Sequence, residues 1–173
     1  MSMGKVLIAA GSALAASALA TGALAAGTVN ATANASVTVI APTSITKTQD
    51  MVFGAVVRPS ALSSGNTTIN LDTLDHVTAT GGDGSVIAST TNSAKFVISS
   101  VAHITYTLSE TLSFTQPGLI NVGPSAAVAT TGTLGDVPAG GNQEIRYGGH
   151  FDMTPSTTPQ NYTGTLAVTV TYN

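Results

Sequence analysis

The chain has 173 residues, of which only 8 % are charged, and it contains no cysteine and no tryptophan. Its formal net charge of −3 argues against nucleic acid as a partner, because a nucleic-acid-binding protein needs a basic face. Without cysteine there are no disulfides, so core packing, backbone hydrogen bonds or a neighbouring molecule must stabilise the fold.

The first 25 residues have the layout of a secretory signal peptide. Lys5 is followed by an apolar run and then by small residues that end in Ala23-Leu24-Ala25, an A-x-A cleavage pattern. Glycine, serine and threonine interrupt the run, and no later stretch has the roughly 20 apolar residues that a membrane helix needs. We therefore expect cleavage after Ala25 or Ala26, secretion, and no integral membrane span in the mature chain. Loss of Lys5 changes the formal net charge from −3 to −4.

The mature chain begins with a long, strict alternation. From Val29 to Val39 every odd position is Val or Ala, every even position is Asn, Thr or Ser, and Pro42 ends the run. This period of two predicts a β-strand with one apolar and one polar face. The apolar face consists of Val29, Ala31, Ala33, Ala35, Val37 and Val39.

No helical pattern is visible after the signal peptide, and the period of two continues along the chain. Short candidate strands alternate with turns rich in glycine, proline and serine, which is typical of an all-β, antiparallel sandwich. We expect a signal peptide (1–25), an N-terminal extension (26–35) and one β-sandwich domain (36–173). The expected strands are residues 36–41, 51–57, 67–72, 76–80, 94–99, 103–108, 112–116, 126–134, 143–152 and 162–172.

The last expected strand is among the most regular of the chain. Leu166, Val168, Val170 and Tyr172 fall on one face, and Gly164 stands where the strand would begin or bend. Since chain ends normally fray, so regular a pattern at the end predicts a strand tied into a sheet.

The sequence contains no recognisable catalytic or metal-binding constellation. Asp72, Asp75 and His76 form a local cluster, but they lack the glycine and the closing glutamate of a calcium loop, and aspartates favour turns. His103 and His150 are the other histidines, and no G-x-S-x-G motif is present. We expect no enzyme activity, no cofactor and no metal.

Three parts of the sequence carry a resemblance to known domains. SVTVIAPTSITKTQDMVFGAVV (36–57), a glycine-rich middle and the ending YTGTLAVTVTYN (162–173) resemble an uncharacterised secreted bacterial β-sandwich domain family. That family looks related to the spore-coat U and chaperone–usher pilin group. The shared marks are Phe53-Gly54, Gly164 and Tyr172, and the resemblance covers about residues 36–173. Many pilins carry a disulfide, which this chain lacks.

The resemblance implies an immunoglobulin-like sandwich that is incomplete by one strand and is completed by strand exchange. A periplasmic chaperone would fill the gap during secretion, and an outer-membrane usher would assemble the subunits at the cell surface or in an extracellular fibre. In the fibre, the N-terminal extension of a neighbouring copy would be the donor strand. The strand that borders the gap would be the C-terminal edge strand with Gly164, Leu166, Val168, Val170 and Tyr172.

Period two alone does not distinguish a strand given to a neighbour from a strand paired within its own chain. The run can also divide, with residues 28–35 donated and 36–41 kept. Two further interpretations remain at this stage: a self-contained cell-surface or matrix domain, and a carbohydrate-binding module that uses exposed aromatic side chains.

Overall fold

The computed structural model describes residues 30–39 and 42–173. The chain divides into two units, Met1–Val37 and Thr38–Asn173, which are described separately. The expected signal peptide (1–25) and Val29 lie outside the described residues. In the described part of the chain, no helix has the length and apolarity needed to cross a membrane.

The alternating run forms neither strand nor helix in its described part. Every residue from 30 to 39 is exposed, and the side chains of Val37 and Val39 are 86 % and 88 % exposed. The expected strand at 36–41 is therefore wrong over residues 36–39, and the first strand of the structure begins at Ser44. The physical reason is that alternation makes a segment suitable for a sheet, whereas a strand forms only when an edge pairs with it.

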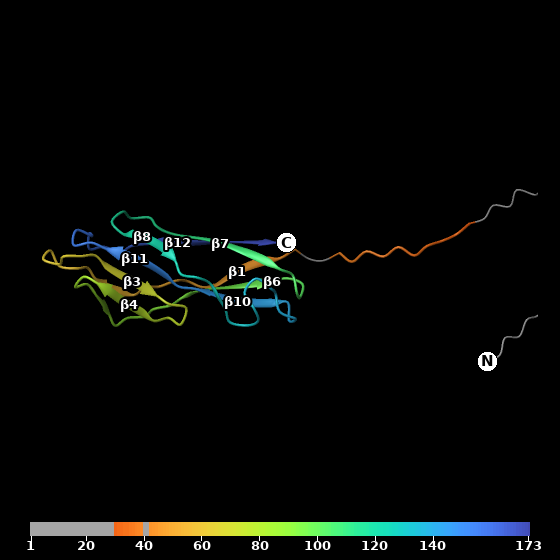
Figure 1. Cartoon of the computed structure of the whole chain (residues 1–173), viewed down its shortest axis with the longest axis horizontal. Coiled ribbons are helices and arrows are strands. Elements are labelled where there is room, and N and C mark those ends of the chain that lie inside the picture. Colours follow the sequence, from red (N-terminus) through yellow and green to blue (C-terminus); the bar gives the residue numbers. More distant parts are fainter. Residues whose placement is uncertain (1–29, 40–41) are drawn as a thin grey trace, which may run out of the picture. The chain divides into compact units, whose positions relative to one another are not determined.

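The rest of the described chain is an antiparallel β-sandwich, as the sequence predicts (Figure 1). One four-stranded sheet has the order β1-β6-β10-β9, and a second has the order β4-β3-β11-β8. Two ribbons, β12-β7 and β2-β5, complete the described strands. The first sheet comprises β1 (Ser44–Gln49), β6 (Ala94–Ser99), β10 (Asn142–Tyr147) and β9 (Val128–Ala129); the second comprises β4 (Val77–Gly81), β3 (Thr67–Leu71), β11 (Gly149–Met153) and β8 (Ile120–Pro124); the ribbons comprise β12 (Gly164–Tyr172), β7 (Tyr106–Phe114), β2 (Ala55–Val57) and β5 (Ser85–Ile87).

Two apolar clusters form the core, and β7 is long enough to reach both. The first core cluster lies between the first sheet and the β12-β7 ribbon, and Leu108 of β7 packs against it. The second core cluster packs against Phe114, at the other end of β7. The first cluster consists of Ala94, Phe96, Ile98, Tyr106, Val137, Ile145 and Tyr147, and the second of Ile69, Phe151 and Met153.

A single glycine divides what the sequence predicts as one strand at 143–152. β10 pairs within the first sheet and β11 within the second, and only Gly148 lies between them. Gly148 is buried, and a Cβ at this position would overlap the carbonyl oxygen of Leu71 and lie 2.9 Å from its carbonyl carbon. The chain changes sheets here because a residue without a side chain lets the backbone approach β3 closely.

Candidate strand-docking edge

The C-terminal strand β12 pairs with β7 along its whole length, from Gly164 opposite Phe114 to Tyr172 opposite Tyr106. The alternation of its sequence determines which side chains face inward. Leu166, Val168 and Val170 are half-buried and pack against the first core cluster, whereas the residues between them are exposed. All five residues of the predicted C-terminal edge strand, Gly164, Leu166, Val168, Val170 and Tyr172, lie on β12.

The outer side of β12 has no partner strand in the described part of the chain. The hydrogen bonds at the two ends of the ribbon, Asn173 N–H to Thr105 O (3.1 Å) and Thr115 N–H to Thr163 O (2.8 Å), join odd-numbered residues. Backbone groups of alternate residues point to the same side of an antiparallel strand. The N–H and C=O groups of the even-numbered residues therefore point outward, so Val168 and its even-numbered neighbours combine a core-facing side chain with unpaired backbone groups.

The first sheet also ends in an edge with which no described strand pairs. Its edge strand is β1, and Ile45 of β1 packs against the same first core cluster as the inward side chains of β12. No strand among the described residues joins β1 to β12. Both layers around the first core cluster therefore have an edge to which a further strand can add.

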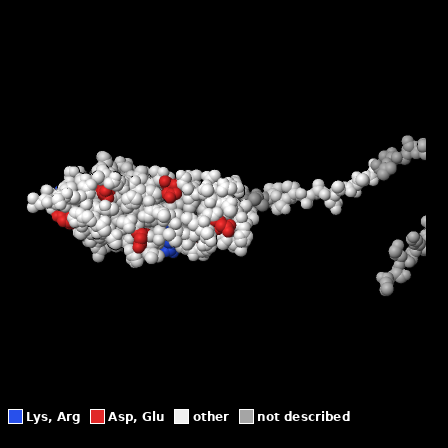
Figure 2. All heavy atoms as spheres, viewed as in Figure 1, with Lys and Arg blue, Asp and Glu red and all other residues white. Residues whose placement is uncertain are grey.

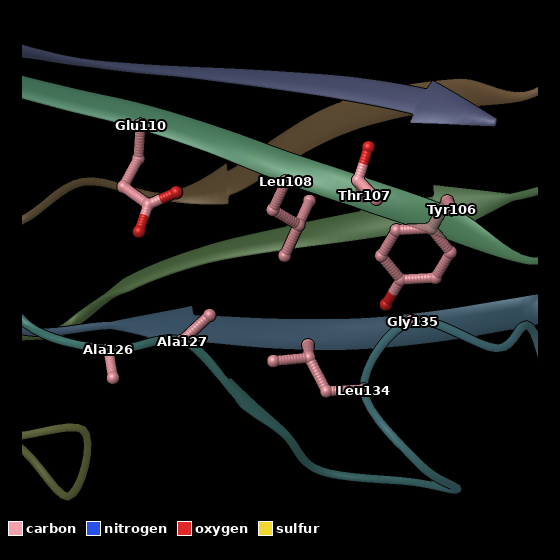
Figure 3. Close-up of a pocket in the computed structure, with 8 residues that line it drawn as sticks. All are labelled: Tyr106, Thr107, Leu108, Glu110, Ala126, Ala127, Leu134 and Gly135. Carbon is pink, nitrogen blue, oxygen red and sulfur yellow. The ribbon is translucent and has the colours of Figure 1, made fainter.

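The other side of β7 faces a pocket of about 430 Å³ (Figure 3). Leu108 and Glu110 of β7 line one wall, and Ala126, Ala127 and Leu134 line the opposite one. Glu110 is half-buried, and its carboxylate points from β7 toward the segment with Ala126 and Ala127 in Figure 3. The remaining lining residues are Tyr106, Thr107 and Gly135.

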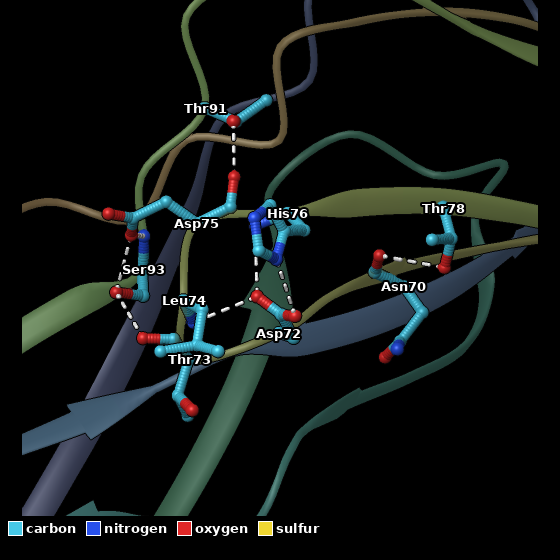
Figure 4. A network of polar contacts seen from close by, with 9 residues as sticks. All are labelled: Asn70, Asp72, Thr73, Leu74, Asp75, His76, Thr78, Thr91 and Ser93. Atoms are coloured by element: carbon cyan, nitrogen blue, oxygen red, sulfur yellow. Dashed lines mark hydrogen bonds and ion pairs between the residues drawn. The ribbon is translucent and has the colours of Figure 1, made fainter.

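The cluster of Asp72, Asp75 and His76 makes hydrogen bonds within the β3–β4 turn and to Ser93, which precedes β6 (Figure 4). The Asp72 carboxylate accepts the backbone N–H groups of Leu74 (2.8 Å) and His76 (2.9 Å), and it lies 3.1 Å from His76 Nδ1. The Asp75 carboxylate accepts the N–H (2.5 Å) and the hydroxyl (2.7 Å) of Ser93, and these bonds hold the pKa of Asp75 below its usual value.

The other histidines do not join this cluster. The nearest acidic group to the ring of His103 is the carboxylate of Asp136 at 3.9 Å, and His150 belongs to β11. Within residues 30–39 and 42–173, no three His, Asp or Glu side chains are arranged to hold a metal ion. On the face drawn in Figure 2 the charged side chains are scattered singly over the domain.

The aromatic side chains mostly fill the core. Phe53, Phe114 and Phe151 pack against one another with ring centroids 5.0–6.2 Å apart, and Phe96 packs edge-on against Tyr147 at 6.0 Å. Of the aromatic residues only Tyr172, at 54 %, is exposed.

A family model described as "Domain of unknown function (DUF4402)" matches residues 43–172. The chain belongs to the DUF4402 family. The expected membership of an uncharacterised family is thus confirmed, and the DUF4402 match spans all strands from β1 to β12. The alternating run lies before the DUF4402 match. The searches of curated proteins and of solved structures found no match.

Proposed function

We propose that this DUF4402 protein is a secreted structural subunit, similar to chaperone–usher pilins, that assembles into fibres by donor-strand exchange. Each copy would donate its N-terminal run to the outer edge of β12 of the next copy. The observation that carries the proposal is that residues 30–39 alternate strictly, are exposed and form no strand, while no described strand pairs with the outer edge of the C-terminal strand.

The chemistry of the run matches that of the edge. A strand adds to a sheet edge through main-chain hydrogen bonds, while alternate side chains enter the core. The run from Val29 to Val39 contains no charge and no proline, and β12 contains no charge either. Pairing the two would therefore bury no ionised group, which is the costliest outcome of strand addition.

The exposed side chains of the run supply a driving force for assembly. Burying Val37 and Val39, which are 86 % and 88 % exposed, would stabilise the assembly by about 1.5–3 kcal/mol each, before conformational entropy is counted. Each new backbone hydrogen bond would contribute about 0.5–1.5 kcal/mol net. Ala31, Ala33 and Ala35 have small side chains that suit shallow sites on the core.

The partners follow from the same proposal. Neighbouring copies of the chain would be the principal partners, and a periplasmic chaperone would cover the β12 edge before an outer-membrane usher assembles the fibre. The predicted signal peptide supports this route of secretion to the cell surface.

The proposal is tested by deleting residues 26–35 from the secreted protein. Wild-type protein should form fibres visible by electron microscopy and oligomers that resist heat and detergent, and the deletion variant should be a folded monomer by circular dichroism and sedimentation. A control variant that keeps the length and composition of 28–35 but scrambles the alternation should also remain monomeric.

Two results would contradict donor-strand exchange. A processed wild-type protein that stays monomeric at high concentration would instead identify a self-contained surface domain. Glycan binding that is lost in Tyr172→Ala, without any fibres, would identify a carbohydrate-binding module.

A further inference from the structure

The two edges of the β12-β7 ribbon differ by one charge. β12 has no charged residue, whereas β7 carries Glu110 at its centre, directly opposite Val168. Leu108 and Leu112, two positions before and after Glu110, also face the core side of the ribbon. Glu110 is therefore a carboxylate that points inward from an otherwise uncharged strand.

Only a short stretch of β7 is open on the side away from β12. Tyr106 N–H donates to Gly135 O (2.9 Å) across that side, so by alternation Leu108 and Glu110 also point their backbone groups toward it. No described strand pairs with this side of β7, and the 430 Å³ pocket opens beside these two residues.

The 130–141 loop covers the Tyr106 end of the same edge. The side-chain amide of buried Gln143 donates to Thr131 O (2.8 Å) and Thr133 O (3.0 Å), and the Tyr106 hydroxyl donates to the side-chain oxygen of Gln143. These bonds fix the loop to β10 and β7, so the open stretch is limited to the part of β7 around Glu110.

Within residues 30–39 and 42–173, no cationic side chain pairs with the Glu110 carboxylate. Among the described residues, neither a hydrogen bond nor an ion pair involves its side chain, so water from the pocket must solvate it. Nearby, the Tyr147 hydroxyl is buried without a hydrogen-bond partner; burial raises the pKa of Tyr147, and the charge of Glu110 raises it further. A strand laid over the pocket would remove this water and leave the carboxylate without a compensating cation.

We infer that Glu110 closes the β7 edge to strand addition, so that each β12-β7 ribbon accepts a single donated run, at β12. This inference rests on the proposed function. Dehydrating a carboxylate without a compensating cation is strongly unfavourable, and inward-pointing charges protect sheet edges from unwanted pairing. The run has no lysine or arginine that could neutralise Glu110, so it would be rejected at β7 and accepted at β12.

The test uses fibres of the full-length mature protein and a fluorescent peptide with the sequence of residues 27–39. In wild-type fibres every β12 edge except the terminal one is occupied, so the β12-β7 ribbons should bind the peptide at fibre ends only, and any peptide bound at β1 should be equal in wild type and variants. In Glu110→Gln, and more strongly in Glu110→Leu, the peptide should label fibres along their length at up to about one peptide per subunit, and fibres should branch. Glu144→Gln, which changes the only other glutamate of the chain, is the matched control and should bind the peptide as wild type does.

Each outcome separates the inference from the proposed function. If wild-type protein forms no fibres, the proposed function itself is wrong. If wild-type and Glu110→Gln fibres both form and both bind the peptide only at their ends, Glu110 does not prevent strand addition at the β7 edge. Donor-strand exchange at β12 would still be supported. Labelling along wild-type fibres to the same extent as along Glu110→Gln fibres would equally overturn the inference. If Glu110→Leu does not fold, the isosteric Glu110→Gln decides the result.

Discussion

Asp75 ties two separate parts of the chain together through a buried serine. Its carboxylate accepts both donors of Ser93, which is fully buried, and its backbone carbonyl accepts the Thr91 hydroxyl at 2.5 Å. Asp75 has a positive φ of 71°, a conformation that aspartate tolerates better than most residues. The β3–β4 turn is thereby fixed to the segment that leads into β6.

We predict that Asp75→Asn destabilises the domain and makes its free energy of unfolding less dependent on pH in the acid range. Losing the charge-assisted bonds to Ser93 should lower the free energy of unfolding at pH 7 by about 1–2 kcal/mol. The folded-state pKa of Asp75 lies below its ordinary value of 3.8, so its stabilising contribution is present above that pH and is lost as the pH falls through the folded-state pKa. Urea unfolding between pH 7 and pH 2 measures both effects.

Asp50→Asn is the control for Asp75→Asn. The Asp50 side chain is 74 % exposed and lies 2.5 Å from Lys47 Nζ in a surface ion pair, which typically contributes less than about 1 kcal/mol. Equal losses of stability in the two variants, or an unchanged acid dependence in Asp75→Asn, would contradict the role of the Ser93 bonds.

We predict that Val168→Asp strongly destabilises the sandwich. The new carboxylate would enter the first core cluster opposite Glu110, in a pair of the closely spaced, non-hydrogen-bonded type. Burial of a charge and repulsion between two carboxylates should together cost about 3 kcal/mol or more. Thr169→Asp, on the exposed face of the same strand, should change stability by less than about 0.5 kcal/mol. A Val168→Asp protein with wild-type Tm would mean that Val168 does not face the core.

At the scale of elements, the sequence predicts strands well where apolar and polar residues alternate clearly. β6 has the predicted bounds, and β3, β4 and β12 begin or end within two residues of theirs. The sequence does not predict β1, because Ile45 is its only apolar residue, or β5, because it has three residues, or β8, because it ends in Gly123-Pro124, residues that favour turns. The sequence also predicts two strands in place of β7, because the core-facing Glu110 reads as a polar interruption of the alternation.

We predict that Gly148→Ala destabilises the connection between the two sheets. A methyl group at this buried position collides with the backbone of Leu71, so β11 and β3 must move apart beside it, at a cost of about 1–3 kcal/mol or more. Gly140→Ala is the matched control, because a Cβ there meets no atom within 4 Å and the residue has no positive φ. It should be neutral or stabilising by up to about 1 kcal/mol. Thermal unfolding of both variants compares them directly, and an unaffected Gly148→Ala would mean that the sheet change needs no glycine.

At the scale of the whole molecule, the sequence pattern predicts the residues of the candidate site, whereas only the family resemblance implied that an edge beside them is open. Alternation from Gly164 to Tyr172 identifies a strand and its inward face, since side-chain direction is a local property. Whether the outer side of β12 is paired depends on which distant strands lie beside it, and pairing of this kind leaves no local signal. Because pairing depends on a partner strand, the alternation at 29–39 predicts a strand although the described residues of this run form none.

The face of the run that enters a neighbouring copy can be tested by placing one charge on either side of it. Ala33 and Thr32 are both exposed, so neither Ala33→Asp nor Thr32→Asp should change the Tm of the isolated subunit. If the odd-numbered face is donated to β12, Ala33→Asp buries a carboxylate in the first core cluster of the next copy and should weaken assembly by about 3 kcal/mol, or about 150-fold in affinity. Thr32→Asp leaves its carboxylate in water on the opposite face and should assemble within a few-fold of wild type. Sedimentation and detergent-resistant oligomers on gels measure the difference. Wild-type assembly of Ala33→Asp would refute donation of this face, and equal loss in both variants would show that assembly depends on the net charge of the run and not on its alternation.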